Sequence, residues 1–195
     1  MYRTAASLRL VFGLAGLAIA LCTGCPQQFE PVFLQDEALE QAVRFELGQP
    51  LGYLTRADLL RLTALDARNR GIRSLDGLEH CENLTWLDLD TNRVADITPV
   101  AGLVNLTYLN LDSNEITDIG PLAGLRNLDG LSLFDNQIGD IQPLVANATN
   151  GGLGFGDYVI LEQATLSERA LTVDVPALRE LGVEVILVEA SGSTR

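Results

Sequence analysis

Leucines recur along the middle of this chain at a fixed spacing of 22 residues, and one asparagine closes each series. Within a series the leucines stand at the first, fourth and sixth places and the asparagine at the ninth, with mostly polar residues between them. This alternation predicts a short β-strand whose leucines point into a core while the intervening side chains face solvent. Three series follow the pattern closely: Leu84–Asn92, Leu106–Asn114 and Leu128–Asn136.

Each series continues in the same way through the rest of its unit. An Ile or Val stands two residues after the asparagine, and a further Ile stands two residues before a proline, at Pro99, Pro121 and Pro143. Proline suits the first turn of a short helix, because its missing N–H would have no partner there. One unit is therefore predicted to be a strand, an asparagine turn and a short 3₁₀ or irregular return. An earlier unit, Leu62–Leu75, keeps the apolar places but carries Arg70 where the others have asparagine.

Such units must stack to be stable. About five buried Leu or Ile side chains contribute roughly 1.5–3 kcal/mol each, whereas ordering each backbone residue costs roughly 1–2 kcal/mol. A single unit therefore cannot fold alone. Neighbouring units supply the hydrogen bonds between strands and cover both sides of each leucine layer. The two ends of the stack expose apolar cross-sections and need caps.

The flanking segments predict these caps. Apolar residues at helical spacing run from Asp36 to Leu47, with Gly48 as a stop signal, and Thr55 is placed to cap a second short helix. After a glycine-rich insertion at 147–156 we expect a strand at 158–161, helices at 167–171 and 176–181, and a strand at 183–188. The predicted parts are a helical N-terminal cap (33–61), the repeats (62–146), a last repeat with a mixed cap (147–190) and a disordered tail (191–195).

The pattern L-x-x-L-x-L-x-x-N is a signature of leucine-rich repeats. The run Asn114–Leu122, which reads Asn-x-Ile-x-Asp-Ile-x-Pro-Leu, and the lead-in Leu62–Ala67 resemble the 22-residue repeats of bacterial internalins. The resemblance covers roughly residues 33–190. It implies an α/β leucine-rich-repeat solenoid with a parallel sheet on its concave face. Internalins are surface proteins that bind host proteins on that face, and this chain has fewer units than their adhesive members.

The first residues resemble a bacterial export signal. Two cations, Arg3 and Arg9, precede an apolar run at Leu10–Leu21. This run is too short to span a bilayer, which takes roughly 20 residues. The Thr-Gly-Cys that follows resembles a lipobox, although Cys22 replaces the leucine that the motif prefers. We predict a signal peptide (1–24), lipidation of Cys25, a tether (25–32) and an exported protein anchored by lipid in the cell envelope. A plain signal peptide and an uncleaved anchor are the alternatives.

The places between the leucines predict the surface that meets a partner. The third, fifth and seventh places of each unit point outward and form three columns across the sheet. Trp86, the single tryptophan, and Tyr108 fall in one column beside acidic residues, a composition typical of binding hot spots. Stacking of these two rings as a purely structural ladder is the alternative. The predicted partner-binding residues are Asp66, Arg68, Trp86, Asp88, Asp90, Tyr108, Asn110, Asp112, Ser132, Phe134, Tyr158 and Glu162.

Charge narrows the class of partner. The net charge is −13 and the chain has no lysine, which argues against nucleic acid because phosphate binding needs clustered cations. Removing Arg3 and Arg9 with the signal would change the charge from −13 to −15. We predict a monomer that binds a protein or peptide with a basic patch. Binding of carbohydrate or peptidoglycan fragments through the aromatic side chains, and a structural role in the envelope, are the alternatives.

Nothing in the chain predicts catalysis, a cofactor or a metal. His80 is the only histidine and has no acid or nucleophile at a known motif spacing, and Cys81 takes the place of a core leucine. The stretch from Asp88 to Asn92 mimics the start of a calcium loop but lacks the later Gly and Glu. The glycines at 151–156 lack the Lys-Ser/Thr of a phosphate loop. We therefore predict a protein that is not an enzyme.

Overall fold

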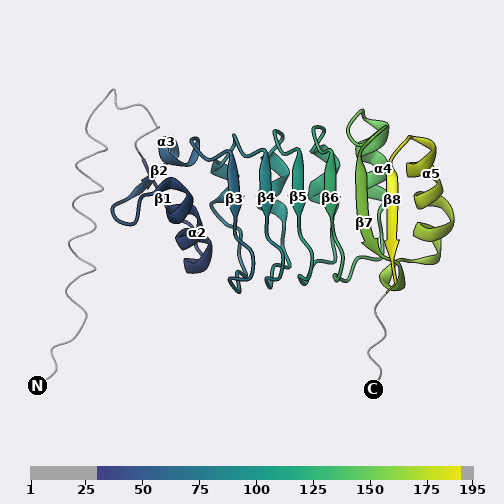
Figure 1. Ribbon diagram of the computed structural model, residues 1–195, viewed down its shortest axis with the longest axis horizontal. Helices are drawn as coiled ribbons and strands as arrows, with labels where there is room; N and C mark the ends of the chain where they lie inside the picture. The colour runs from purple at the N-terminus through teal and green to yellow at the C-terminus, as the bar shows by residue number, and fades with distance from the viewer. Residues whose placement is uncertain (1–29, 190–195) are drawn as a thin grey trace, which may run out of the picture.

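The repeats form one parallel sheet, as their spacing predicts. A computed structural model describes residues 30–189, and Figure 1 shows its long sheet with the strands side by side in chain order. Every pairing in this six-stranded sheet is parallel. The strands are β3 (Ala64–Asp66), β4 (Trp86–Asp88), β5 (Tyr108–Asn110), β6 (Gly130–Ser132), β7 (Tyr158–Glu162) and β8 (Glu184–Val188).

The central residue of each strand points into the core. Leu65, Leu87, Leu109 and Leu131 pair in register across β3–β6, and each is 0% exposed. Neighbouring strands are about 4.8 Å apart, so each leucine layer covers the next one. The predicted inward places of the degenerate first unit, from Leu62 to Leu75, are buried as well. The hydrophobic periodicity therefore determines one continuous core along the array.

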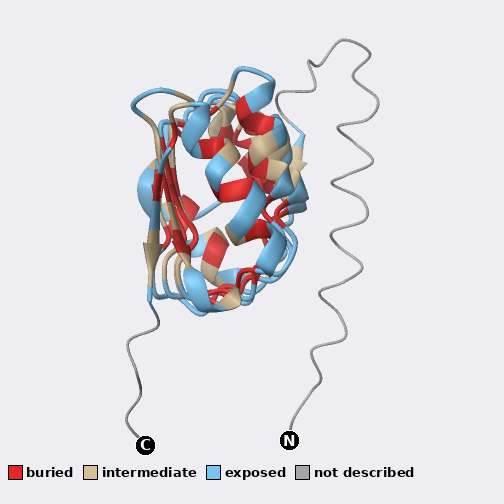
Figure 2. Ribbon diagram, turned by 90° about the vertical axis from the view of Figure 1, so that its right-hand side faces the viewer, coloured by how far each residue is buried: buried red, intermediate tan, exposed pale blue. Residues whose placement is uncertain are grey.

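Short helices cover the other side of this core. Figure 2 views the array from its end and shows the sheet along one side, helices along the other and buried residues between them. The 3₁₀ helices η3 and η4 each have a proline in their first turn, as predicted. The short returns are η2 (Leu78–His80), η3 (Thr98–Gly102) and η4 (Gly120–Gly124).

The fourth return differs from the prediction. Pro143 opens an α-helix, α4 (Gln142–Thr149), so the segment expected as a glycine-rich insertion from 147 begins inside a helix. Asn147 is 0% exposed and donates to the carbonyl oxygens of Leu122 and Leu125 at 3.0 and 2.9 Å. Its own side-chain oxygen accepts the N–H of Leu153 at 2.8 Å. Hydrophobic periodicity did not reveal this helix, because a buried polar residue anchors it.

The repeated asparagines satisfy buried backbone groups at the turns. The Asn114 amide donates to the carbonyl oxygens of Leu89, Leu111 and Asp112 at 3.0–3.1 Å, and its Oδ1 accepts the N–H of Val94 at 3.0 Å. Unpaired, these groups would each cost about 1–3 kcal/mol. Asn92 and Asn136 donate to the equivalent carbonyl groups, two in their own unit and one in the preceding unit. The residue before each asparagine has left-handed backbone: Thr91 (φ 57), Ser113 (φ 52) and Asp135 (φ 54).

The N-terminal cap contains the predicted helices α2 (Glu37–Leu47) and α3 (Arg56–Leu59). Gly48 ends α2 with φ 64, and Thr55 caps α3 in a reciprocal hydrogen-bonded box with Asp58. The cap also contains an antiparallel ribbon that was not predicted, made of β1 (Pro31–Val32) and β2 (Leu54–Thr55). The last two residues of the expected tether, 25–32, therefore belong to the folded cap.

Asp36 joins this cap to the first repeat. One carboxylate oxygen caps α2 by accepting the N–H groups of Ala38 and Leu39 at 2.9 and 3.2 Å. The other accepts the N–H of Arg73 at 2.8 Å and that of Ser74 at 3.4 Å. Burial raises the pKa of Asp36, but the four N–H donors together hold it below its ordinary value. The cap is thus held on the array by polar as well as apolar contacts.

The C-terminal cap continues the sheet with β7 and β8, close to the predicted strands. The two helices expected at 167–171 and 176–181 instead form one run, in which the π-helix η6 (Ala170–Asp174) passes directly into α5 (Val175–Glu180). A short 3₁₀ helix, η5 (Gln163–Thr165), follows β7. The cap covers the end of the core with Ala170, Val175 and Leu178.

Several predictions concern residues outside the described range. The signal peptide (1–24), the lipidation of Cys25 and the tail (191–195) fall there and stay predictions. Within residues 30–189, no helix is both long enough and apolar enough to cross a membrane.

Candidate functional site

The outward side chains of the six strands form one surface, here called the open face because the helices lie on the other side of the sheet (Figure 2). Pairing in register confirms that the predicted residues align in columns. The third-place column is Ala64, Trp86, Tyr108, Gly130 and Tyr158, and the fifth-place column is Asp66, Asp88, Asn110, Ser132 and Ile160. The seventh-place residues, at or just past the strand ends, are Arg68, Asp90, Asp112, Phe134 and Glu162.

The third-place column carries a stacked aromatic pair. The ring centroids of Trp86 and Tyr108 are 5.6 Å apart and their planes differ by 9°. The ladder that was one of the two sequence interpretations is therefore present. Both side chains are half-buried, so they also contribute surface to the open face. Because the two rings face each other along the sheet, each covers one face of the other.

A third ring extends this row through the missing side chain of Gly130. A Cβ atom at Gly130 would lie only 2.7 Å from the ring carbon Cζ and the hydroxyl oxygen of Tyr158. The Tyr158 ring thus folds back over β6 into the space that a side chain would fill. Trp86, Tyr108 and Tyr158 form what we call the aromatic row. The sequence pattern placed these residues in one column but did not show why Gly130 interrupts it.

Arg68 is held by two carboxylates at the start of the open face. Its Nε and Nη2 donate to the two oxygens of Asp66 at 3.0 and 2.8 Å, and Nε lies 3.5 Å from Asp88 Oδ2. The hydrogen bond from Arg68 is the main reason that the pKa of Asp66 is lowered. Asp66 and Asp88 therefore largely neutralise Arg68, the one cation among the predicted contact residues.

Asp88 lies below the surface of the open face. It is 4% exposed, and its Oδ1 accepts the N–H of Asp90 at 3.0 Å. Burial raises its pKa above the ordinary value, and the negative charges of Asp66 and Asp90 add to this, although the Asp90 N–H and Arg68 oppose it. Asp88 supports the strand end and offers little area to a partner.

Asp112 spans the gap between β5 and β6. Its Oδ1 accepts the hydroxyl of Ser132 at 2.5 Å and the N–H of Phe134 at 2.7 Å. Burial raises the pKa of Asp112, and the nearby charges of Asp90 and Asp88 also raise it, against the lowering effect of these two hydrogen bonds. Ser132 itself is 4% exposed. The expectation that Asp88 and Ser132 face a partner is therefore corrected, because neighbouring side chains and turns cover both.

The far end of the open face contains residues that the sequence interpretation omitted. Strand β8 adds Glu184, Ile186 and Val188 to the three columns, opposite Tyr158, Ile160 and Glu162. Ile186 is 38% exposed. A strand was predicted here, so extending the alternation of side chains by one strand would have found them. The open face thus ends in a surface richer in apolar side chains.

A hollow of about 540 Å³ adjoins the acidic end of the open face. It is formed by side chains from the turns after β3 and β4 together with the end of α2, including Phe45, which is 76% exposed. Its lining residues are Phe45, Glu46, Asp66, Arg68, Asn69, Arg70, Asp90 and Thr91. Three predicted contact residues, Asp66, Arg68 and Asp90, therefore share one concavity.

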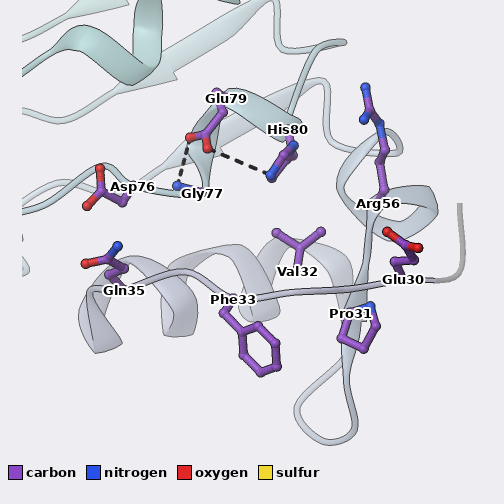
Figure 3. A pocket seen from close by; sticks show the side chains of 10 residues that line it. All are labelled: Glu30, Pro31, Val32, Phe33, Gln35, Arg56, Asp76, Gly77, Glu79 and His80. Atoms are coloured by element: carbon purple, nitrogen blue, oxygen red, sulfur yellow. Dashed lines mark hydrogen bonds and ion pairs between the residues drawn. The ribbon is translucent and has the colours of Figure 1, made fainter. Parts of the chain in front are cut away.

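A second cavity, of about 560 Å³, lies in the N-terminal cap away from the open face (Figure 3). His80 is at its rim, with Nε2 3.8 Å from Glu79, whose other oxygen accepts the N–H of Gly77 at 2.8 Å. Figure 3 shows Val32 directed toward these residues and Phe33 directed away from them. Cys81 is 0% exposed, and burial raises the pKa of its thiol to about 12, which makes it a core side chain. Across residues 30–189, no three His, Cys, Asp or Glu side chains form a group able to hold a metal ion.

Comparison with known proteins agrees with this architecture. A sequence model of the family described as Leucine Rich repeats (2 copies) matches residues 104–146. An internalin of Listeria monocytogenes, InlF, is similar in structure, with 27% identity and a TM-score of 0.69 over 85% of this chain and 48% of InlF. The chain therefore spans about half the length of that internalin.

Two further solved structures match less well. Internalin C2 of Listeria monocytogenes is 24% identical, with a TM-score of 0.36 over 78% of this chain and 93% of its own. The CBM51-2 and INT domains of Clostridium perfringens ZmpB, solved in complex with GlcNAc, are 26% identical, with a TM-score of 0.43 over 55% of this chain and 21% of theirs. The fold assignment rests on InlF, the repeat model and the strand register together. The chain has a leucine-rich-repeat fold that is similar to that of a bacterial internalin.

Proposed function

We propose that this protein is an exported, lipid-anchored module that binds a protein or peptide through its open face. The leucine-rich-repeat architecture supports a role in protein interaction in general. The observation that carries the proposal is the aromatic row of Trp86, Tyr108 and Tyr158, which shares the open face with Asp90 and Asp112. Large, partly exposed rings beside charges are frequent at interface hot spots.

The charges of the open face favour a partner with a basic patch. Arg68 is already paired with Asp66 and Asp88, while the charge of Asp90 raises the pKa values of both Asp88 and Asp112. A cation from a partner would relieve this repulsion between like charges. The aromatic rings would pack against the apolar part of the same segment. An extended peptide or one edge of a domain fits a surface of six strands, which is about 25 Å wide.

Substitutions on the open face test this proposal. We expect Trp86→Ala and Asp90→Arg each to reduce capture of the partner from a native envelope extract at least about tenfold, as loss of a hot spot does. Asp90 is a better probe than Asp88, whose burial would confound binding with folding. Val104→Ala is the matched control, since Val104 is 49% exposed but lies outside the open face. Equal capture by all three variants, quantified by mass spectrometry, would contradict the proposal.

The alternative of carbohydrate binding is less favoured by the ring geometry. Sugars pack on the faces of aromatic rings, and one face of Trp86 and one face of Tyr108 are already covered by the other ring, with the centroids 5.6 Å apart. Titration of the Trp86 fluorescence with peptidoglycan fragments distinguishes the two functions. A saturable change with glycans and none with the captured protein would replace our proposal, and an envelope phenotype insensitive to every open-face variant would favour a structural role.

The anchor is tested separately. We expect Cys25→Ser to release the protein from the membrane fraction into the aqueous phase of a detergent partition, because the acyl chains on that cysteine would supply the attachment. Unchanged partitioning of this variant would remove lipidation from the proposal. Binding by the open face would be unaffected by that result.

A further inference from the structure

Exposed large hydrophobic side chains are frequent in the N-terminal cap. Four large hydrophobic residues there point into solvent: Phe33 (73% exposed), Phe45 (76%), Leu51 (84%) and Tyr53 (53%). They fall within 21 residues, while the other exposed large hydrophobic residues of the described chain are spread from residue 104 to 186. We call these four side chains the cap patch. An apolar group of this kind is typical of an interaction surface.

The β1–β2 ribbon places two members of the cap patch together. Pro31 pairs with Thr55 and Val32 with Leu54, so the next positions in this antiparallel register are Phe33 and Tyr53. Residues opposite each other across antiparallel strands point to the same side. Val32 and the buried Leu54 point inward, which directs Phe33 and Tyr53 outward. Figure 3 shows Phe33 and Val32 on opposite sides of the chain.

The loop that carries Leu51 is held in place by α2. Arg44 donates from Nη1 to the carbonyl oxygen of Gln49 at 3.2 Å and from Nη2 to that of Gly52 at 3.0 Å. The side chain of Gln49 donates to the carbonyl oxygen of Tyr53 at 3.1 Å. Leu51 is thus presented on an ordered loop, which projects from the N-terminal end of the array (Figure 1).

The position of the chain start points to what covers the cap patch. Cys25 lies five residues before Glu30, where the described chain begins. Five extended residues reach at most about 18 Å. An acyl group on Cys25 would therefore keep the cap within about 18 Å of the bilayer surface. Strand β8, at the opposite end of the array, is about 24 Å from β3 along the sheet and would therefore lie farther from the bilayer.

We propose that the cap patch inserts into the interfacial layer of the phospholipid bilayer and fixes the orientation of the anchored protein. This inference rests on the lipid anchor in the proposed function. The contact is apolar and not electrostatic, because Arg44 is already bound to Glu40 and to two carbonyl oxygens. Binding should accordingly occur on zwitterionic lipid and persist at high salt.

A tryptophan moved into the cap patch tests the contact. Trp86 is the single tryptophan, so Trp86→Phe gives a silent background for Leu51→Trp. The matched control is Phe155→Trp, at a site that is 97% exposed in the C-terminal cap. On vesicles of phosphatidylcholine with brominated acyl chains, we expect the tryptophan at 51 to be quenched at least about twofold and its emission to shift to the blue. The tryptophan at 155 should show neither change.

The design separates failure of the cap patch from failure of the anchor. The same variants are measured in two forms: the protein purified from membranes, and a Cys25→Ser form attached by an N-terminal histidine tag to nickel-chelating lipid in the same vesicles. Quenching of the tryptophan at 51 in the tagged form supports the cap patch whether or not Cys25 is lipidated. Equal emission from the tryptophans at 51 and 155 in both forms overturns the inference. So does a blue shift that depends on protein concentration without vesicles, which would mean that a second copy covers the patch.

Discussion

The two halves of the open face share one backbone ladder but differ in their side chains. The first half, on β3–β5, is acidic and contains Asp66, Asp88, Asp90, Asn110 and Asp112 beside Trp86 and Tyr108. The second half, on β6–β8, has apolar residues at comparable places: Phe134, Ile160, Ile186 and Val188. The aromatic row crosses the boundary, because Tyr158 reaches back over Gly130.

The two halves also differ in which side chains accept the backbone N–H groups at the strand ends. In the acidic half each fifth-place side chain accepts an N–H two residues later: Asp66 from Arg68, Asp88 from Asp90 and Asn110 from Asp112. Ser132 does not do this, and Asp112 instead reaches across to the N–H of Phe134. Many polar side chains on this surface therefore already accept hydrogen bonds from the backbone, which limits the hydrogen bonds that they can form with a partner.

The largest expected effect comes from breaking the core beneath both halves. Leu109→Asp puts an unpaired charge into a site that is 0% exposed, and we expect a loss of about 4–5 kcal/mol or more of unfolding free energy. Both halves should unfold together, because each leucine layer covers its neighbours. Circular dichroism melting and hydrogen exchange of β7 and β8 measure this. Asn110→Asp, one residue away and facing outward, is the control, and native exchange protection in β7–β8 of the Leu109 variant would contradict the prediction.

Next in size is loss of the buried asparagine ladder that both halves use. Asn114→Ala leaves the N–H of Val94 without its partner and removes one of two hydrogen bonds at the carbonyl oxygens of Leu89, Leu111 and Asp112, which together should cost about 2–4 kcal/mol. Asn136→Ala, below the second half, should cost a similar amount. Asn127→Ala is the matched control, since its exposed amide donates to one carbonyl oxygen only, that of Val104. Equal losses at Asn114 and Asn127 in urea denaturation would refute this role.

A smaller effect on stability is expected at the boundary between the halves. Gly130→Ala would push the Tyr158 ring out of the aromatic row, because the new Cβ atom would lie 2.7 Å from it. The ring end can move, so we expect a loss of no more than about 1 kcal/mol in unfolding free energy. Partner binding should weaken clearly more than stability does. Gly124→Ala, where a Cβ meets open space, is the control; an undisturbed Tyr158 ring in a crystal structure of Gly130→Ala would count against the row.

The smallest effect concerns the acidic half and its pH dependence. The pKa of buried Asp88 is raised, so the folded protein binds more protons than the unfolded chain, and its contribution to stability falls as pH rises through that range. Asp88→Asn should therefore stabilise the protein at neutral pH, by on the order of 1 kcal/mol or less. Asn110 already fills the equivalent place on β5.

Asp66→Asn is the comparison for this last prediction, because the contribution of Asp66 to stability depends on pH in the opposite direction. The pKa of Asp66 is lowered, mainly by the hydrogen bond from Arg68, so its contribution is present at neutral pH and is lost as the pH falls through that lowered value. The Asp66 variant should not be more stable than the natural protein at pH 7. Thermal melting of both variants between acidic and neutral pH checks the signs. A lower melting temperature for Asp88→Asn at neutral pH would show that the link to Arg68 outweighs the cost of burying the charge.

The sequence pattern predicts the fold closely in the repeats, where each residue follows the same spacing of 22. The spacing of the leucines predicts the strands, the register and the columns of the open face, and it places Trp86 next to Tyr108. The helix signals at Gly48 and Thr55 are confirmed as well. The prediction is weaker after Pro143, where Asn147 is buried in α4 and the period of 22 no longer applies.

The sequence by itself determined which side chains point inward and which point outward, because a strand alternates its side chains whatever surrounds it. Only the tertiary structure decided how much of each outward residue is accessible. Asp88 and Ser132 are covered by groups that are distant in the chain or lie past the strand ends, and Gly130 matters only because Tyr158, 28 residues later, fills its space. Accessibility depends on the volume and hydrogen bonds of neighbours across strands, and a periodic pattern carries no information about these.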